Sequence, residues 1–81
     1  MITIDVFVPM IGKTYDFSID ENIIVETIIE EITELIIQKE NFVSSEVSDM
    51  YLFSNSDNQM LNKMFSLKEN GIDTGDQLFL I

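Results

Sequence analysis

The sequence predicts one α+β domain in which a mixed sheet of four to five strands is covered on one face by a single long helix. Two stretches near the N-terminus alternate apolar and polar residues with the period of a strand. The segment from about residue 24 to 39 instead repeats apolar residues at three- and four-residue steps, as an amphipathic helix does. The remaining sequence ends in further short apolar runs. Because 81 residues leave room for one hydrophobic core, the domain is expected to span residues 1–81.

The N-terminal quarter predicts a β-hairpin with one buried face. Residues 2–8 ("ITIDVFV") and 14–19 ("TYDFSI") both alternate, and the segment between them contains Pro9 and Gly12, which favour a turn. The side chains expected to face the core are Ile2, Ile4, Val6, Val8, Tyr15, Phe17 and Ile19.

The predicted helix extends from about Ile24 to Lys39. Its apolar stripe consists of Val25, Ile28, Ile29, Ile32, Leu35 and Ile36, with Glu26, Glu30 and Glu34 on the opposite face. Isoleucine is a weak helix former, so packing on the sheet must stabilise the helix. Ile23 and Ile37 lie off the stripe and are expected to make contacts at the helix ends.

The second half predicts two short strands, a single helical turn and a closing strand. A polar connection (41–49) leads to an apolar run, "MYLF" (50–53), in which we expect Tyr51 and Phe53 to face the helix. A brief fourth strand is expected near Met60 and Leu61. Ser66 and Glu69 have the spacing of a capping box, and Asn70-Gly71 would end that helical turn. After a tight turn at 73–76, the last strand, "QLFLI" (77–81), would turn Leu78 and Leu80 inward.

Composition narrows the class of partner. Fifteen acidic residues against four lysines, with no arginine, give a net charge of −11. Nucleic acid and anionic membrane surfaces are therefore disfavoured, and a basic protein surface would be attracted. The N-terminus lacks the basic flank of a signal peptide, and the four glutamates of the helix exclude a membrane span. We expect a cytoplasmic protein with no direct membrane insertion.

The residue types needed for catalysis are missing. The chain contains no cysteine and no histidine, which removes the usual nucleophile and base. The helix glutamates are expected on a solvated face with no pocket to raise their pKa. The loop "SNSDNQM" lacks the acidic spacing and glycine of a calcium loop. The sequence predicts no enzyme, no cofactor and no metal site.

The order of elements resembles the β-grasp, or ubiquitin-like, fold. The tail "SLKENGIDTGDQLFLI" is similar to the closing segment of ubiquitin-like domains, with Leu67, Ile72, Gly75-Asp76, Leu78 and Leu80 at the matching positions. The resemblance implies that the first and last strands pair in parallel at the sheet centre. Within this superfamily the chain most resembles the YukD/EsaB family of bacterial type VII secretion systems, through its length, its "YDFSI" strand and its "I-x-x-GD-x-L" close. That implies an accessory or regulatory role, with docking on a cytoplasmic part of the secretion machinery.

The predicted binding site lies on the sheet face that the helix leaves open. Alternation places four apolar side chains outward: Phe7, Leu52, Phe79 and Ile81. Such a patch usually marks an interaction surface, and we expect Phe79→Asp to abolish binding without unfolding the protein. Two alternatives stay open: a homodimer formed through this face, and a modifier or sulfur carrier that has lost its Gly-Gly tail, since the sequence ends at Ile81 without one.

Overall fold

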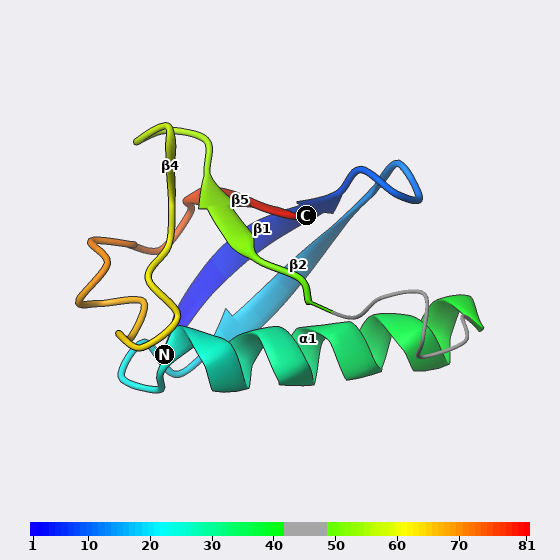
Figure 1. The fold of residues 1–81 in the computed structure, drawn as a ribbon, viewed down its shortest axis with the longest axis horizontal. Helices are drawn as coiled ribbons and strands as arrows, with labels where there is room; N and C mark the ends of the chain where they lie inside the picture. Colours follow the sequence, from blue (N-terminus) through cyan, green and yellow to red (C-terminus); the bar gives the residue numbers. More distant parts are fainter. Residues whose placement is uncertain (42–48) are drawn as a thin grey trace.

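The structure is a computed structural model that describes residues 1–41 and 49–81, so most of the predicted polar connection (41–49) lies outside the described residues. Within the described residues, one long helix lies across one face of a sheet (Figure 1). The elements are β1 (Ile2–Val8), β2 (Lys13–Ile19), α1 (Val25–Glu40), β3 (Leu52–Ser54), β4 (Gln59–Met60) and β5 (Gln77–Leu80). This arrangement confirms the predicted α+β class and settles the number of strands in the described sheet at five.

The sheet has the order β2-β1-β5-β3-β4, with β1 and β5 adjacent at its centre. These two strands run parallel, whereas the β1–β2, β3–β5 and β3–β4 pairs are antiparallel. The parallel central pair is the one that the sequence resemblance implied. Because β1 and β5 are flanked by other strands on both sides, their inward side chains are shielded from solvent at the sheet edges.

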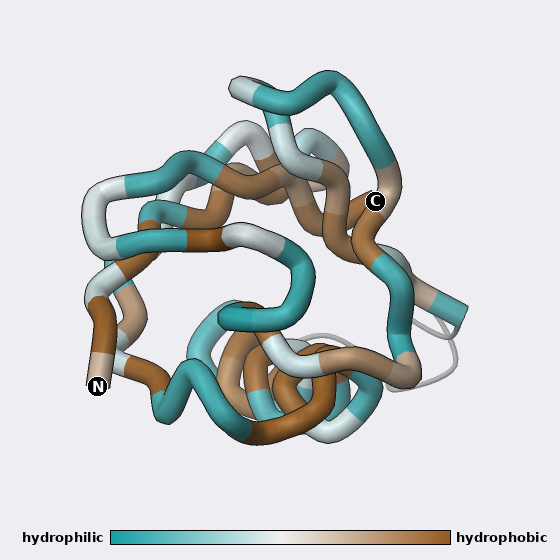
Figure 2. The backbone as a smooth tube through the Cα atoms, turned by 90° about the vertical axis from the view of Figure 1, so that its left-hand side faces the viewer, coloured by the Kyte–Doolittle hydropathy of each residue, from teal (hydrophilic) through white to brown (hydrophobic). Residues whose placement is uncertain are grey.

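The core lies between the sheet and α1. The inward residues of the central strands, among them Ile4, Val6, Leu78 and Leu80, are almost completely buried. Tyr15, Phe17 and Ile19 of β2 pack against this core but are only half-buried, since β2 is an edge strand. Seen from the side (Figure 2), the hydrophobic backbone stretches belong mainly to the strands and to α1, and the loops at the outside are mostly hydrophilic.

One residue of the predicted helix stripe is misplaced. Val25, Ile28, Ile29, Ile32 and Ile36 are buried as expected, but Leu35 is 53% exposed. At ~100° per residue, Leu35 falls about 80° from the centre of the buried stripe. It therefore overhangs the edge of the sheet, where it lines a shallow groove with Tyr15 and Phe17 of β2.

The start of α1 is capped by backbone rather than by a side chain. Ile24 occupies the N-cap position and has no side-chain oxygen to offer. Instead, the Val25 N–H donates to the Phe65 carbonyl (2.8 Å) and the Glu26 N–H donates to the Lys63 carbonyl (3.0 Å). The first N–H groups of a helix have no partner within it. Here the segment after β4 supplies two of the missing acceptors and attaches the helix to the rest of the fold.

The predicted capping box is confirmed. The Ser66 N–H donates to Glu69 Oε1 and the Glu69 N–H donates to Ser66 Oγ, both at 3.0 Å. The residues that follow form a hydrogen-bonded turn, in which the Asn70 N–H donates to the Ser66 carbonyl at 3.0 Å. Gly71 ends this turn at φ 78°, a left-handed conformation that glycine adopts at no steric cost.

Candidate functional site on the open sheet face

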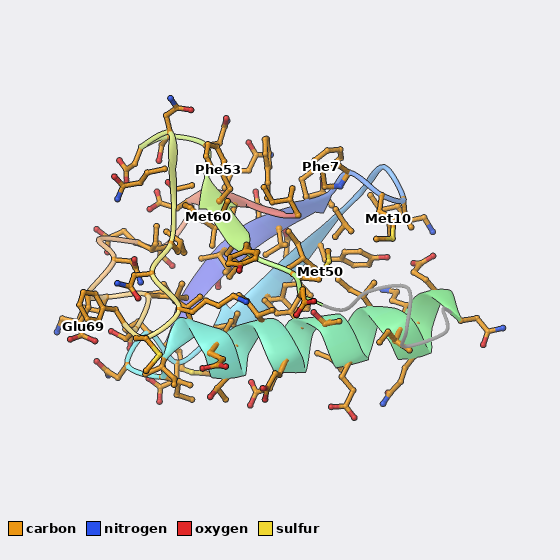
Figure 3. All side chains as sticks on the ribbon, viewed as in Figure 1. Phe7, Met10, Met50, Phe53, Met60 and Glu69 are labelled. Atoms are coloured by element: carbon orange, nitrogen blue, oxygen red, sulfur yellow. The ribbon has the colours of Figure 1, made fainter. Side chains whose placement is uncertain are left out.

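A row of apolar side chains crosses the sheet face opposite to α1. Strand register places Phe7 of β1 beside Phe79 of β5, and Phe79 beside Phe53 of β3. Phe53 is in turn opposite Met60 of β4. Figure 3 shows Phe7 and Phe53 on the side of the sheet away from the helix, whereas Met50 lies between sheet and helix. We call Phe7, Phe53 and Phe79 the phenylalanine row.

The Phe79 ring lies between the other two and packs against both. The Phe7 and Phe79 ring centroids are 5.6 Å apart and meet edge to face at 66°, and those of Phe53 and Phe79 are 6.4 Å apart at 28°. Mutual contact leaves each ring half-buried. Met60 and Ile81, at the margins of the row, are 47% and 45% exposed. The face therefore presents a continuous apolar strip over four neighbouring strands.

The structure corrects one predicted site residue. Leu52 does not point outward; its side chain is completely buried, with 0% exposure. It pairs with Leu80, and Ser54 pairs with Leu78, so both share the inward face of those leucines. Phe53 takes the outward position, and Tyr51 is exposed at 43%. Phe7, Phe79 and Ile81 are less buried than Leu52, and Phe79 lies next to Phe7 in the register of the sheet.

The register error has a physical source. All four residues of "MYLF" are apolar, so alternation in this segment does not distinguish its two faces. The small polar Ser54 then occupies an inward position, where its hydroxyl accepts a hydrogen bond from the Asp57 N–H at 3.3 Å. The L-x-L pattern of β5 identifies its own inward residues, Leu78 and Leu80, but the residues of β3 that share this face follow only from the register between the two strands.

Two carboxylates lie on the open face, two residues along the strands from the phenylalanine row. Asp5 of β1 is directly opposite Asp16 of β2, and on its other side Asp5 is opposite Gln77 of β5. The hydrogen bond and the like charge of Asp16 raise the pKa of the Asp5 carboxyl. Like charges placed directly opposite on a sheet are destabilising. The open face thus has an acidic part adjoining an apolar part.

The lysines are located elsewhere. Lys13 forms an ion pair with Glu40 at the end of α1 (2.9 Å), and the Lys39 ammonium lies 5.2 Å from the Tyr15 ring. The Lys63 ammonium lies 3.8 Å from the centroid of the Tyr51 ring. Lys68 lies in the turn after Ser66, where its backbone N–H donates to the Glu21 carbonyl. Within residues 1–41 and 49–81, the ion pairs join Met1 to Glu21 and Lys13 to Glu40, and neither includes Asp5 or Asp16.

Among the described residues, the Tyr15–Glu40 pair is a second place where pKa values are shifted. The Tyr15 hydroxyl donates a hydrogen bond to Glu40 Oε2, and Lys13 binds the other oxygen of that carboxylate. Partial burial, followed by the hydrogen bond and charge of Glu40, raises the pKa of Tyr15 to about 12. The same hydrogen bonds lower the pKa of Glu40. Since this cluster ties β2 to the end of α1, we assign it a structural role.

Acidic side chains are numerous in the part of the chain that the structure describes. No group of three acidic side chains there is arranged to hold a metal ion. Glu26, Glu30, Glu31 and Glu34 are all exposed on the helix, as the sequence predicts. Over the same residues, no helix combines the length and apolar character needed to cross a membrane.

Comparison with known proteins identifies the fold. No protein-family model and no curated protein matches the sequence. Among solved structures, the chain is similar to the EccD5 ubiquitin-like domain from Mycobacterium xenopi, with a TM-score of 0.79 and 15% identity over 99% of this chain and 91% of that one. It is also similar to a ubiquitin-like domain of an Arabidopsis thaliana protein, with a TM-score of 0.73 and 20% identity over 99% and 74% of the two chains. The chain has the ubiquitin-like β-grasp fold.

Proposed function

We propose that this chain is a protein-interaction module that binds a partner protein through the open face of its sheet. One observation carries the proposal: on the face that α1 does not cover, three neighbouring strands each contribute a phenylalanine, and the central ring, Phe79, packs against both of the others. Aromatic side chains are enriched among residues that dominate binding energy, and a contiguous apolar patch is unusual on a surface that only meets water.

We further propose that the module is an accessory or regulatory component of a bacterial type VII secretion system, acting at the cytoplasmic side. The sequence resemblance to the YukD/EsaB family supports this role. The likeness in fold to the EccD5 ubiquitin-like domain is compatible with it. The absence of histidine and cysteine from the chain favours a binding role over catalysis.

A genetic experiment tests both parts of the proposal. The gene is deleted in its host, secretion of type VII substrates is measured, and the strain is complemented with wild type, Phe79→Asp or Phe65→Asp. Phe65 is a matched control because it is 48% exposed and lies in the segment that caps α1 rather than on the open face. We expect Phe65→Asp to restore secretion and Phe79→Asp to fail at equal protein level.

Each outcome bears on a different part. Full complementation by Phe79→Asp would contradict a role for the open face in binding. Normal secretion in the deletion strain would contradict the secretion role and leave the binding role to be tested with purified protein. Light scattering of wild type against Phe79→Asp tests the alternative of a homodimer, since only a dimer formed through this face would dissociate in the variant.

A further inference from the structure

The open face also indicates what kind of partner it accepts, an inference that rests on the proposed function. We propose that the partner segment places a lysine or arginine on the Asp5–Asp16 carboxyl pair and an adjacent apolar side chain on the phenylalanine row. The proposal follows from three properties of this face: its geometry, its charge and the position of the lysines.

The carboxyl pair and the phenylalanine row are separated by the distance between alternate residues of an extended chain. Asp5 and Phe7 are two residues apart on β1, so their side chains leave the same face about 7 Å from each other. Asp16 and Phe79 extend each part onto the neighbouring strands. A partner strand that carries a cationic residue and an apolar residue at alternate positions has the same spacing and would contact both parts together.

The charge of this face favours a cationic side chain on the partner. The residues that strand register places around the carboxyl pair on the open face are neutral: Thr3 and Phe7 on β1, Thr14 and Ser18 on β2, and Gln77 on β5. Neither carboxylate belongs to an ion pair in the described residues. Because the pair is already repulsive, a cation bound between the two would relieve that repulsion as well as add its own attraction.

The same charges argue against a second copy of this chain as the occupant. Two copies joined through their open faces would bring together two carboxyl pairs on molecules that each have a net charge of −11. The four lysines lie away from this face: Lys13 and Lys39 are located at the β2–α1 junction, Lys63 lies against Tyr51, and Lys68 lies in the turn beside Glu21. A basic, partly apolar segment of another protein fits this face better.

Synthetic peptides test the proposal directly. The first probe is an end-capped peptide with lysine, phenylalanine and leucine at alternate positions and serine between them. The second is identical except that glutamate replaces lysine. Binding is followed by amide chemical shifts of the labelled protein. We expect the lysine peptide to shift resonances of Asp5, Asp16, Phe7 and Phe79, and to bind more tightly than the glutamate peptide.

Variants then separate this inference from the proposed function. Asp5→Asn and Asp16→Asn should each weaken binding of the lysine peptide by about three- to fivefold at low salt, and high salt should reduce the difference. Glu31→Gln, which removes the same charge from the exposed side of α1, should have little effect. The carboxyl carbon of Asp5 should also titrate at lower pH when the lysine peptide is bound.

Three results would overturn the inference. Equal affinity for the two peptides, unchanged binding in Asp5→Asn and Asp16→Asn, or no shift on the open face with the lysine peptide would each do so. If Phe79→Ala still abolishes binding in the second case, the proposed function stands and only the cation contact is wrong. If Phe79→Ala binds as wild type does, the open face is not the binding surface and both proposals fail.

Discussion

Phe7 and Phe79 lie side by side on the parallel central strands, and their rings meet edge to face at a centroid distance of 5.6 Å. The pair joins the two strands that are farthest apart in the sequence and also forms the middle of the proposed binding face. It therefore contributes to the fold and, in our proposal, to recognition. The two contributions can be measured separately.

A double-mutant cycle should detect the contact in the free protein. Aromatic pairs contribute about 0.5–1.5 kcal/mol beyond the apolar area they bury. We expect Phe7→Ala and Phe79→Ala to show a coupling of that order in the free energy of unfolding, measured by urea denaturation. As the control, Phe7→Ala combined with Phe65→Ala should be additive within about 0.3–0.5 kcal/mol, and an equal coupling there would rule out a specific contact.

The orientation of β3 predicts that alanine substitutions at two neighbouring residues, Leu52 and Tyr51, differ strongly in their cost to stability. Leu52 is completely buried against the helix side of the sheet, so Leu52→Ala should lower the free energy of unfolding by about 2–5 kcal/mol. That is a large share of the ~4–12 kcal/mol expected for a chain of this size. Tyr51→Ala should cost clearly less, because Tyr51 is exposed. If Tyr51→Ala cost more than Leu52→Ala, Leu52 would point outward, as the sequence predicted, and the orientation of β3 described above would be wrong.

The capping box gives a smaller and more local prediction. Ser66→Ala removes the Oγ that accepts the Glu69 N–H and leaves that donor without its partner in a largely buried site. We expect a loss of about 1 kcal/mol in the free energy of unfolding. Ser18→Ala, at an exposed position of β2, should change the value by less than about 0.5 kcal/mol. Equal effects of the two substitutions would show that the Ser66 cap contributes nothing.

Sequence reasoning reached most of the fold because most elements carry strong periodic signals. The alternation of β1 and the stripe of α1 each involve several residues, so a single ambiguous position changes little. Leu35 shows the limit of this reasoning. Its spacing fits the stripe, but its burial depends on how far the sheet extends beneath the helix, which a one-dimensional pattern does not contain. The backbone cap of α1 by Lys63 and Phe65 was missed for a similar reason, since backbone acceptors have no sequence signature.

The site was predicted less completely than the fold. Phe7 and Phe79 were placed on the open face because alternation is clear in β1 and β5. Phe53 was missed and Leu52 wrongly included because β3 is short and uniformly apolar at its start. The Asp5–Asp16 pair was missed for another reason. The two residues form a pair only because the register between β1 and β2 places them directly opposite each other, and each one alone is an ordinary outward-facing aspartate.

The carboxyl pair should affect stability in a defined range of pH. The pKa of Asp5 is raised above its ordinary 3.8 in the folded protein. The folded protein therefore binds the carboxyl proton of Asp5 more tightly than the unfolded chain does. Its contribution is fully present below pH 3.8 and is lost as pH rises through the raised value. We therefore expect Asp5→Asn to be more stable than wild type at neutral pH, and the difference to shrink in acid.

Urea denaturation over a pH series measures this difference. Wild type alone would be ambiguous, because the pKa of Glu40 is lowered and its contribution is lost as pH falls. The Asp5→Asn and wild-type curves share that term, so subtracting them isolates the pair. A difference that stays constant with pH would show that Asp5 and Asp16 do not interact in the folded protein.

The Tyr15–Glu40 hydrogen bond should be visible at alkaline pH. Because the pKa of Tyr15 is raised from 10.0 to about 12, the folded protein holds this proton over a range in which an unfolded chain has released it. The associated stability is present below pH 10 and is lost as pH rises toward 12. In a Tyr51→Phe background Tyr15 is the last tyrosine, so ultraviolet absorbance reports its ionisation alone. Glu40→Gln should move that titration toward pH 10, because it removes the negative charge that opposes a tyrosinate. An unchanged titration would mean that burial alone holds the proton and that Glu40 does not stabilise the junction of β2 with α1.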